Sequence, residues 1–232
     1  MLIRHRDAEP SVDPTAYVAP TATLVGDVRV GPRARVMYGA VLDAEGSRIE
    51  VGESAIVSEH AVLRATAVTD VDTAVSVGDH GFIGPHATVL GATVGRCAYL
   101  AAQVTVLHLA RVGDGASVAV GALVHARTLL PDEFFVPPHT TAIGDPVRVL
   151  SPDQTDELAD AIRGTAFADA AFGVRIEWTD RITRYRQVAE VRSAEYAAHA
   201  DDTVVDWADP QSRPGRADPT TPRRAEPPAT PS

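Results

Sequence analysis

The stretch that decides the fold is residues 100–124, LAAQVTVLHLARVGDGASVAVGALV, in which an aliphatic side chain returns at every sixth position. The same period begins near residue 24 and runs to residue 124, with two interruptions and one step of five residues. Four places after most of its members comes a small or β-branched residue, most often Ala. A helix does not keep a period of six, and a hairpin sheet has a period of two. The pattern therefore predicts short strands joined by tight corners, three to each coil. The periodic residues are Leu24, Val30, Val36, Leu42, Val51, Val57, Leu63, Val77, Ile83, Val89, Val94, Leu100, Val106, Val112, Val118 and Val124.

This period resembles that of the hexapeptide-repeat superfamily, whose fold is a left-handed parallel β-helix. The resemblance covers residues 11–150 and implies an all-β fold of that class, shaped as a three-sided prism. Two interruptions of the period, 43–50 and 69–76, are expected to be loops that leave the prism. Residues 136–147 resemble the closing coil that the superfamily shares.

The chain after the prism has helical signals over residues 151–200. Ser151-Pro152-Asp153-Gln154 offers a capping residue, Pro at the first helical position and Gln three residues after the cap, so a helix should begin there. We expect Gly164 to interrupt it and a second, amphipathic helix to follow, with Ile182, Tyr185, Val188 and Tyr196 on its apolar face. Residues 210–232 are rich in Pro, Arg, Thr and Asp and are expected to form a disordered tail.

Composition excludes several classes of function. The chain has 232 residues, a formal charge of -10 and no Lys, which argues against nucleic-acid binding, Schiff-base chemistry and a P-loop. A single cysteine, Cys97, can form neither an intrachain disulfide nor a cysteine zinc cluster, which favours a reducing compartment. No apolar stretch is long enough for a signal core or a membrane span, so we expect a cytoplasmic protein without a membrane partner.

Within the superfamily, the chain resembles the γ-class carbonic anhydrases. The resemblance rests on Val25-Gly26-Asp27-Val28, the loop after Leu42, the break near residue 70 and the five-residue step after Val89. It implies a homotrimer in which three histidines hold a divalent metal at subunit interfaces. In the family these ligands come from V-L-H and from G-H-x-x-x-x-H-G.

All three ligand positions differ here. The corresponding segments are Val62-Leu63-Arg64 and residues 84–91, so the family's ligands are replaced by Arg64, Pro85 and Leu90. The family's R-G-D loop becomes Asp43-Ala44-Glu45, and its buried Gln falls at Ser58. Arg cannot ligate a metal, and Pro and Leu offer no side-chain donor. We therefore expect no metal cofactor at these positions and no hydration of carbon dioxide.

Other residues could carry the remaining chemistry. His60 and His86 each follow an inward aliphatic residue by three places, so a relocated metal site is an alternative, although solvent-facing histidines are common. The Arg64 guanidinium could bind a carboxylate, with Asp43, Glu45 and Glu59 in nearby phases. That carboxylate belongs either to an adjacent subunit, a structural role that we favour, or to a ligand.

The sequence thus favours a homotrimer that binds a small anionic or acyl ligand at its subunit interfaces. Candidate ligand-binding or interface residues are Arg64, Asp43, Glu45, Glu59 and His86. One alternative is an acyl- or acetyl-CoA transferase or a thioesterase on the same clefts, with coenzyme A as cofactor and His125 or His139 as base. Another is a carbonic anhydrase with relocated metal ligands. The sequence leaves open whether the protein is an enzyme.

Overall fold

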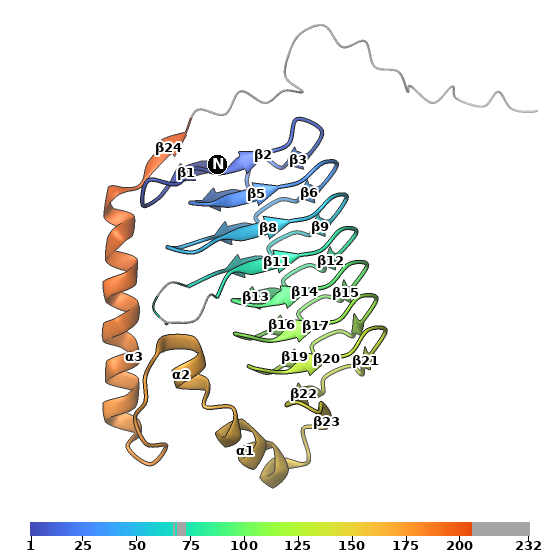
Figure 1. Ribbon diagram of the computed structural model, residues 1–232, viewed down its shortest axis with the longest axis vertical. Coiled ribbons are helices and arrows are strands. Elements are labelled where there is room, and N and C mark those ends of the chain that lie inside the picture. The colour runs from blue at the N-terminus through green and yellow to red at the C-terminus, as the bar shows by residue number, and fades with distance from the viewer. Residues whose placement is uncertain (67, 69–72, 206–232) are drawn as a thin grey trace, which may run out of the picture.

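Each coil of the chain contributes one strand to each of three sheets, as the computed structural model shows (Figure 1). The structure describes residues 1–66, 68 and 73–205. The predicted tail over 210–232 and part of the second predicted loop lie outside these residues. Neighbouring strands of the coils pair in parallel, so the fold class predicted from the six-residue period is confirmed.

Within each sheet, neighbouring parallel strands come from successive coils, so their labels differ by three. The ten-stranded sheet holds β23 (Arg148–Leu150), β22 (Thr141–Ile143), β19 (Leu123–Val124), β16 (Thr105–Val106), β13 (Thr88–Leu90), β10 (Val62–Arg64), β7 (Val41–Asp43), β4 (Thr23–Val25), β1 (Leu2–Arg4) and β24 (Thr203–Val205). One seven-stranded sheet holds β2 (Ser11–Val12), β5 (Val28–Val30), β8 (Ile49–Val51), β11 (Val75–Val77), β14 (Thr93–Val94), β17 (Arg111–Val112) and β20 (Leu129–Leu130). The other holds β21 (Phe135–Val136), β18 (Ser117–Val118), β15 (Tyr99–Leu100), β12 (Phe82–Ile83), β9 (Ile56–Val57), β6 (Arg35–Val36) and β3 (Tyr17–Val18).

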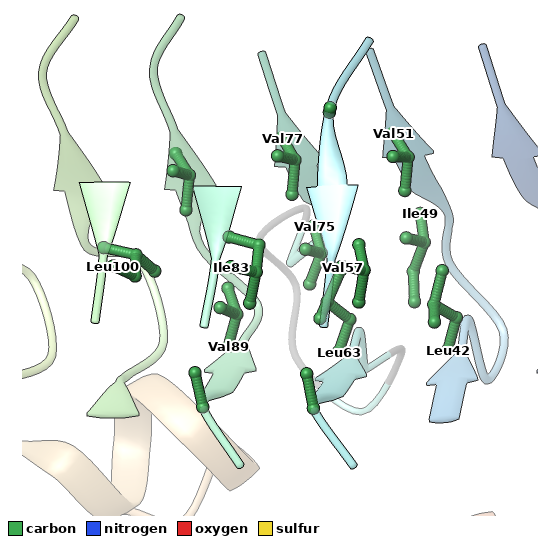
Figure 2. Close-up of a cluster of buried hydrophobic side chains, with 14 of the residues drawn as sticks. Leu42, Ile49, Val51, Val57, Leu63, Val75, Val77, Ile83, Val89 and Leu100 are labelled. Carbon is green, nitrogen blue, oxygen red and sulfur yellow. The ribbon is translucent and has the colours of Figure 1, made fainter. Parts of the chain in front are cut away.

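The core is a set of aliphatic columns that run along the prism. Leu42, Leu63 and Val89 are register partners on successive coils and are fully buried, as Figure 2 shows. A buried side chain of this size contributes roughly 1.5–3 kcal/mol through removal from water. Corner residues such as Ala34 and Ala55 are also fully buried, which explains why the corner positions are small.

The two predicted loops are shorter than their predicted bounds. Asp43 belongs to β7 and Ile49 and Glu50 to β8, so the first loop covers only 44–48. Val75 and Ser76 belong to β11, which pairs with β8. The strands extend beyond the predicted limits because backbone pairing with neighbouring coils continues through polar residues that interrupt the apolar period.

The helical segment differs from its prediction in two respects. Helix α1 spans Thr155–Gly164 and so begins after Gln154, because Ser151 N donates to Gln154 Oε1 in a turn that precedes the helix. It ends at Gly164 as predicted, and a short helix, α2 (Phe167–Phe172), follows. Helix α3 (Arg181–Tyr196) runs beside the prism, and η1 (Ala197–Asp201) leads from it to β24, which pairs with β1 (Figure 1).

The predicted apolar face of α3 is largely uncovered in this chain. Ile182 and Tyr185 are 86% and 57% exposed, whereas Glu195 on the same helix is 4% exposed. Ile182 and Tyr185 therefore do not face the protein core in this chain. Within the described residues, no helix is long and apolar enough to cross a membrane.

Candidate functional site

Two of the family's ligand positions, Arg64 and Leu90, fall at the carboxyl ends of neighbouring strands in the ten-stranded sheet. Asp43, Arg64 and Leu90 are the last residues of β7, β10 and β13, and the parallel register makes Arg64 the partner of both of the others. Pro85 lies between β12 and β13, in the turn that precedes Thr88. The prism therefore places an arginine beside an alkyl side chain at this edge.

Arg64 is held by groups of its own chain. Its Nη2 lies 3.3 Å from Asp43 Oδ2 and its Nε lies 3.8 Å from Glu45 Oε1. Its Nη1 donates to the Tyr196 hydroxyl at 2.7 Å, and its guanidinium carbon lies 5.4 Å from the centre of that ring. The positive charge is thus balanced by two nearly buried carboxylates and covered by an aromatic ring from α3.

Glu45 is the most deeply buried acid of this cluster. Its side chain has no exposed surface, and Arg192 Nη2 lies 3.6 Å from its Oε1. Burial raises the pKa of Glu45, and the neighbouring carboxylates Asp43 and Glu195 raise it further. Arg192 is also paired with Glu195, which accepts a hydrogen bond from Thr66 Oγ1 at 3.0 Å. The cluster therefore ties α3 to two coils of the prism.

The residues at the family's ligand positions do not fit a metal ion. Arg64 carries a permanent charge and is paired with Asp43, while Leu90 and Pro85 have no donor atom in their side chains. A divalent cation at this edge would meet the guanidinium instead of an imidazole.

Glu59 and the two predicted histidines lie at corners of the prism. In the described part of the chain, the carboxylates within ion-pair distance of Arg64 are Asp43 and Glu45, and Glu59 is not among them. His60 and His86 are exposed and stacked, with ring centres 5.2 Å apart and planes at 13°. Among the described residues, no third His, Cys, Asp or Glu completes a group of metal-ligand atoms with this pair. A metal there would need a ligand from another subunit.

A second candidate site lies between the prism and the helices. A cavity of about 500 Å³ is lined by His125, Phe167, Trp178, three arginines and several aliphatic residues. His125 and His108 are buried, and each ring lies 5.9 Å from the ring of Phe167. Burial lowers the pKa of His125 and lowers that of His108 to about 4, so both are neutral near pH 7.

The structure brings in residues that the periodic pattern could not predict. Arg192 of α3 and His199 of η1 reach Glu45, Tyr196 of α3 accepts a hydrogen bond from Arg64, and His5 reaches Glu45 from the end of β1. None of these four belongs to the six-residue repeat. Cys97 is exposed at a corner of the prism.

The chain is similar to γ-carbonic anhydrases and to a carnitine operon protein. No family model matches it. It is 32% identical over 139 residues to gamma carbonic anhydrase 2, mitochondrial, from Arabidopsis thaliana, covering 56% of this chain and 50% of the relative. It is 29% identical to the carnitine operon protein CaiE from Escherichia coli strain K12, covering 64% and 71%. The chain thus spans about half the length of the first of these relatives.

A hexapeptide transferase family protein from Anaplasma phagocytophilum is 22% identical and superposes with a TM-score of 0.40, covering 83% of this chain and 97% of that one.

Proposed function

Because the chain is a γ-carbonic-anhydrase-like protein of the hexapeptide-repeat superfamily, we propose that it binds a small anionic or acyl ligand and does not hydrate carbon dioxide. One observation supports the proposed absence of carbon dioxide hydration. At the family's metal position, the Arg64 guanidinium is bound by Asp43 and by the Tyr196 hydroxyl, with Leu90 as its register partner. These positions offer no side-chain donor that could hold the zinc of a zinc-bound hydroxide.

The cavity lined by His125 supports the proposed binding of a small anionic or acyl ligand. Its wall includes Arg163, Arg175 and Arg184 but only two carboxylates, those of Asp169 and Glu177. Asp169 is already neutralised by Arg175 at 2.8 Å and Arg127 at 3.1 Å. The aromatic and aliphatic remainder of the wall suits an alkyl chain, and the excess of guanidinium groups suits a carboxylate. The ligand class that fits this wall is a carboxylate with an alkyl chain, or an acyl group attached to an anionic carrier.

A homotrimer would place this cavity at a subunit interface, as we propose. Tyr185 lines the cavity and is 57% exposed, and Ile182 next to it is 86% exposed. The face of β15 and β21 also leaves Tyr99 and Phe135 47% and 58% exposed. Large apolar side chains left open on one chain are the type of surface that oligomers bury. A cytoplasmic location stays a prediction.

Titration with carboxylates tests the ligand proposal. We expect acetate, butyrate and octanoate to bind with increasing affinity and to change the fluorescence of Trp178, which lines the cavity. Arg184 lies 5.1 Å from the Trp178 ring, so Arg184→Gln should weaken binding about tenfold. Arg186→Gln is the matched control, because Arg186 is on the same helix, is 69% exposed and is not part of the cavity wall. Equal affinities for the two variants would contradict the proposal.

A second candidate function, acyl transfer, is favoured by the state of His125. Its Nδ1 is buried without a hydrogen bond in the described structure, and the neutral ring lines the cavity. Such a ring can take the proton of an acceptor hydroxyl or amine while that acceptor attacks a thioester carbonyl. The new acyl bond then forms, the C–S bond breaks, and coenzyme A leaves as the protonated thiol.

Release of free thiol from acetyl-CoA tests this alternative. His125→Ala should abolish the release, whereas His139→Ala should not, because His139 is an exposed corner residue. If the wild type binds acetyl-CoA but releases no thiol in the presence of hydroxyl and amine acceptors, acyl transfer is contradicted and only the binding function remains.

A further inference from the structure

Three segments that are far apart in the sequence meet at the N-terminal end of the prism. His5 follows β1, Glu45 lies in the loop after β7, and His199 lies in η1. One ligand atom from each of these residues lies within 4.8 Å of the other two. Two imidazoles and a carboxylate are a donor set typical of zinc and other first-row divalent metals.

The two imidazoles are oriented by one carboxylate. Asp202 Oδ1 lies 2.7 Å from His5 Nδ1, and Asp202 Oδ2 lies 2.9 Å from His199 Nδ1. The rings are stacked, with centres 4.3 Å apart and planes at 25°. Because a carboxylate accepts hydrogen bonds, it favours a proton on each Nδ1 and leaves the Nε2 lone pair of the neutral ring available. This is the arrangement of the second ligand layer in histidine metal sites.

The donor atoms on the other side have no hydrogen bond. His5 Nε2 and both carboxylate oxygens of Glu45 are buried without a hydrogen-bond partner in the described structure, and the side chains of both residues have no exposed surface. Guanidinium nitrogens of Arg64 and Arg192 lie 3.8 and 3.6 Å from Glu45 Oε1, beyond hydrogen-bond distance. Burial of polar atoms without a hydrogen bond is costly, so His5 Nε2 and the Glu45 carboxylate point to a further ligand. His199, with 28% of its side chain exposed, leaves a route to solvent.

The charges around the cluster leave room for a cation. Two guanidinium groups oppose four carboxylates when both imidazoles are neutral, which leaves an excess of two negative charges. The cations are Arg64 and Arg192, and the carboxylates are Asp43, Glu45, Glu195 and Asp202. A divalent cation would cancel this excess, as would protons on both imidazoles.

We propose that His5 Nε2, His199 Nε2 and Glu45 hold a divalent first-row metal ion, of which zinc is the best match. None of its three ligands stands at a family ligand position, although Glu45 Oε1 lies 3.8 Å from Arg64 Nε. The site joins β1 and the C-terminal segment to the prism. Donors about 2.1 Å from a tetrahedral ion lie roughly 3.4 Å apart. The observed 3.4 Å between His199 Nε2 and Glu45 Oε2 matches this value. The other separations, within 4.8 Å, need movements on the order of 1 Å. Three protein ligands leave a fourth position for water or a small anion.

Equilibrium dialysis of the full-length, chelator-treated protein against Zn²⁺ tests the site. We expect one Zn²⁺ per chain, at least tenfold weaker binding by His199→Ala, and no displacement by excess Mg²⁺, which prefers oxygen ligands. Asp202→Asn should weaken binding by about 10- to 100-fold through loss of imidazole orientation. His86→Ala is the matched control, since His86 belongs to the other stacked pair and should bind Zn²⁺ as the wild type does.

Absence of Zn²⁺ binding by the wild type, or equal binding by His199→Ala, would overturn the proposal. Loss of Zn²⁺ binding in His86→Ala would show that the metal binds at the His60–His86 pair, which would also overturn the proposal. Long-range ¹H–¹⁵N spectra of the wild type avoid any effect of a variant on folding. Zn²⁺ should shift the Nε2 signals of His5 and His199, and unchanged signals at saturating Zn²⁺ would also overturn it.

Discussion

The protein contains two stacked pairs of imidazoles, and they differ in how the chain builds them. His60 and His86 lie at equivalent corners of neighbouring coils, because β10 pairs with β13 in register. His5 and His199 come from opposite ends of the described chain and meet through β1 and η1. The first pair follows from the repeat, whereas the second depends on how the C-terminal segment packs against the prism.

The environments of the two pairs differ in the same way. His60 and His86 are exposed, whereas His5 is buried and shares the Asp202 carboxylate with His199. A regular repeat presents the same outward positions on every coil, and these face solvent or another subunit. Irregular segments can instead enclose polar groups, which need specific partners. We therefore expect the regular part to supply stability and the junction with the C-terminal segment to supply chemistry.

The largest expected effect is on the regular side of this comparison. Leu63 is fully buried between Leu42 and Val89, so Leu63→Ala should lower the free energy of unfolding by about 2–5 kcal/mol. Ile182→Ala, at a residue that is 86% exposed, is the control and should change it by less than about 0.5 kcal/mol in the monomer. Urea denaturation measures both. A small loss for Leu63→Ala would show that the column is not the source of stability.

The next effect concerns the boundary between prism and helices. Burial lowers the pKa of His108 to about 4 from 6.5, so the unfolded chain binds a proton that the folded chain does not. Stability from this residue is complete above pH 6.5 and is lost as pH falls toward 4, by up to about 3 kcal/mol. His108→Asn should flatten this part of the curve of stability against pH. If the slope of stability against pH is unchanged in His108→Asn, groups other than His108 cause the loss of stability in acid.

The smallest effects compare the two imidazole pairs directly. His5→Ala removes a buried ring and a hydrogen bond to Asp202, so it should cost about 1–3 kcal/mol in metal-free protein. His86→Ala removes an exposed ring and should change stability by less than about 0.5 kcal/mol. Thermal unfolding in the presence of a chelator measures both. Equal costs would remove the distinction between regular and irregular parts.

The sequence predicts the prism well because one physical requirement, an inward aliphatic residue, recurs on every coil. The same register places Arg64 between Asp43 and Leu90. It could not predict the contacts of Glu45 with Arg192 and His199, since these depend on the packing of α3. The apolar pattern of α3 did not identify the residue that this helix buries. Glu195 is buried because Arg192 and Thr66 satisfy its carboxylate, while Ile182 lies open.

With Arg64, Pro85 and Leu90 at the positions of the family's metal ligands, the protein should not hydrate carbon dioxide. Stopped-flow hydration by the zinc-treated His199→Ala variant separates this expectation from the proposed new site, because the variant removes a ligand of that site and leaves Arg64, Pro85 and Leu90 in place. The rate should equal that of buffer alone. A rate clearly above buffer, lost on treatment with a chelator, would show a working metal centre and contradict the proposed absence of activity.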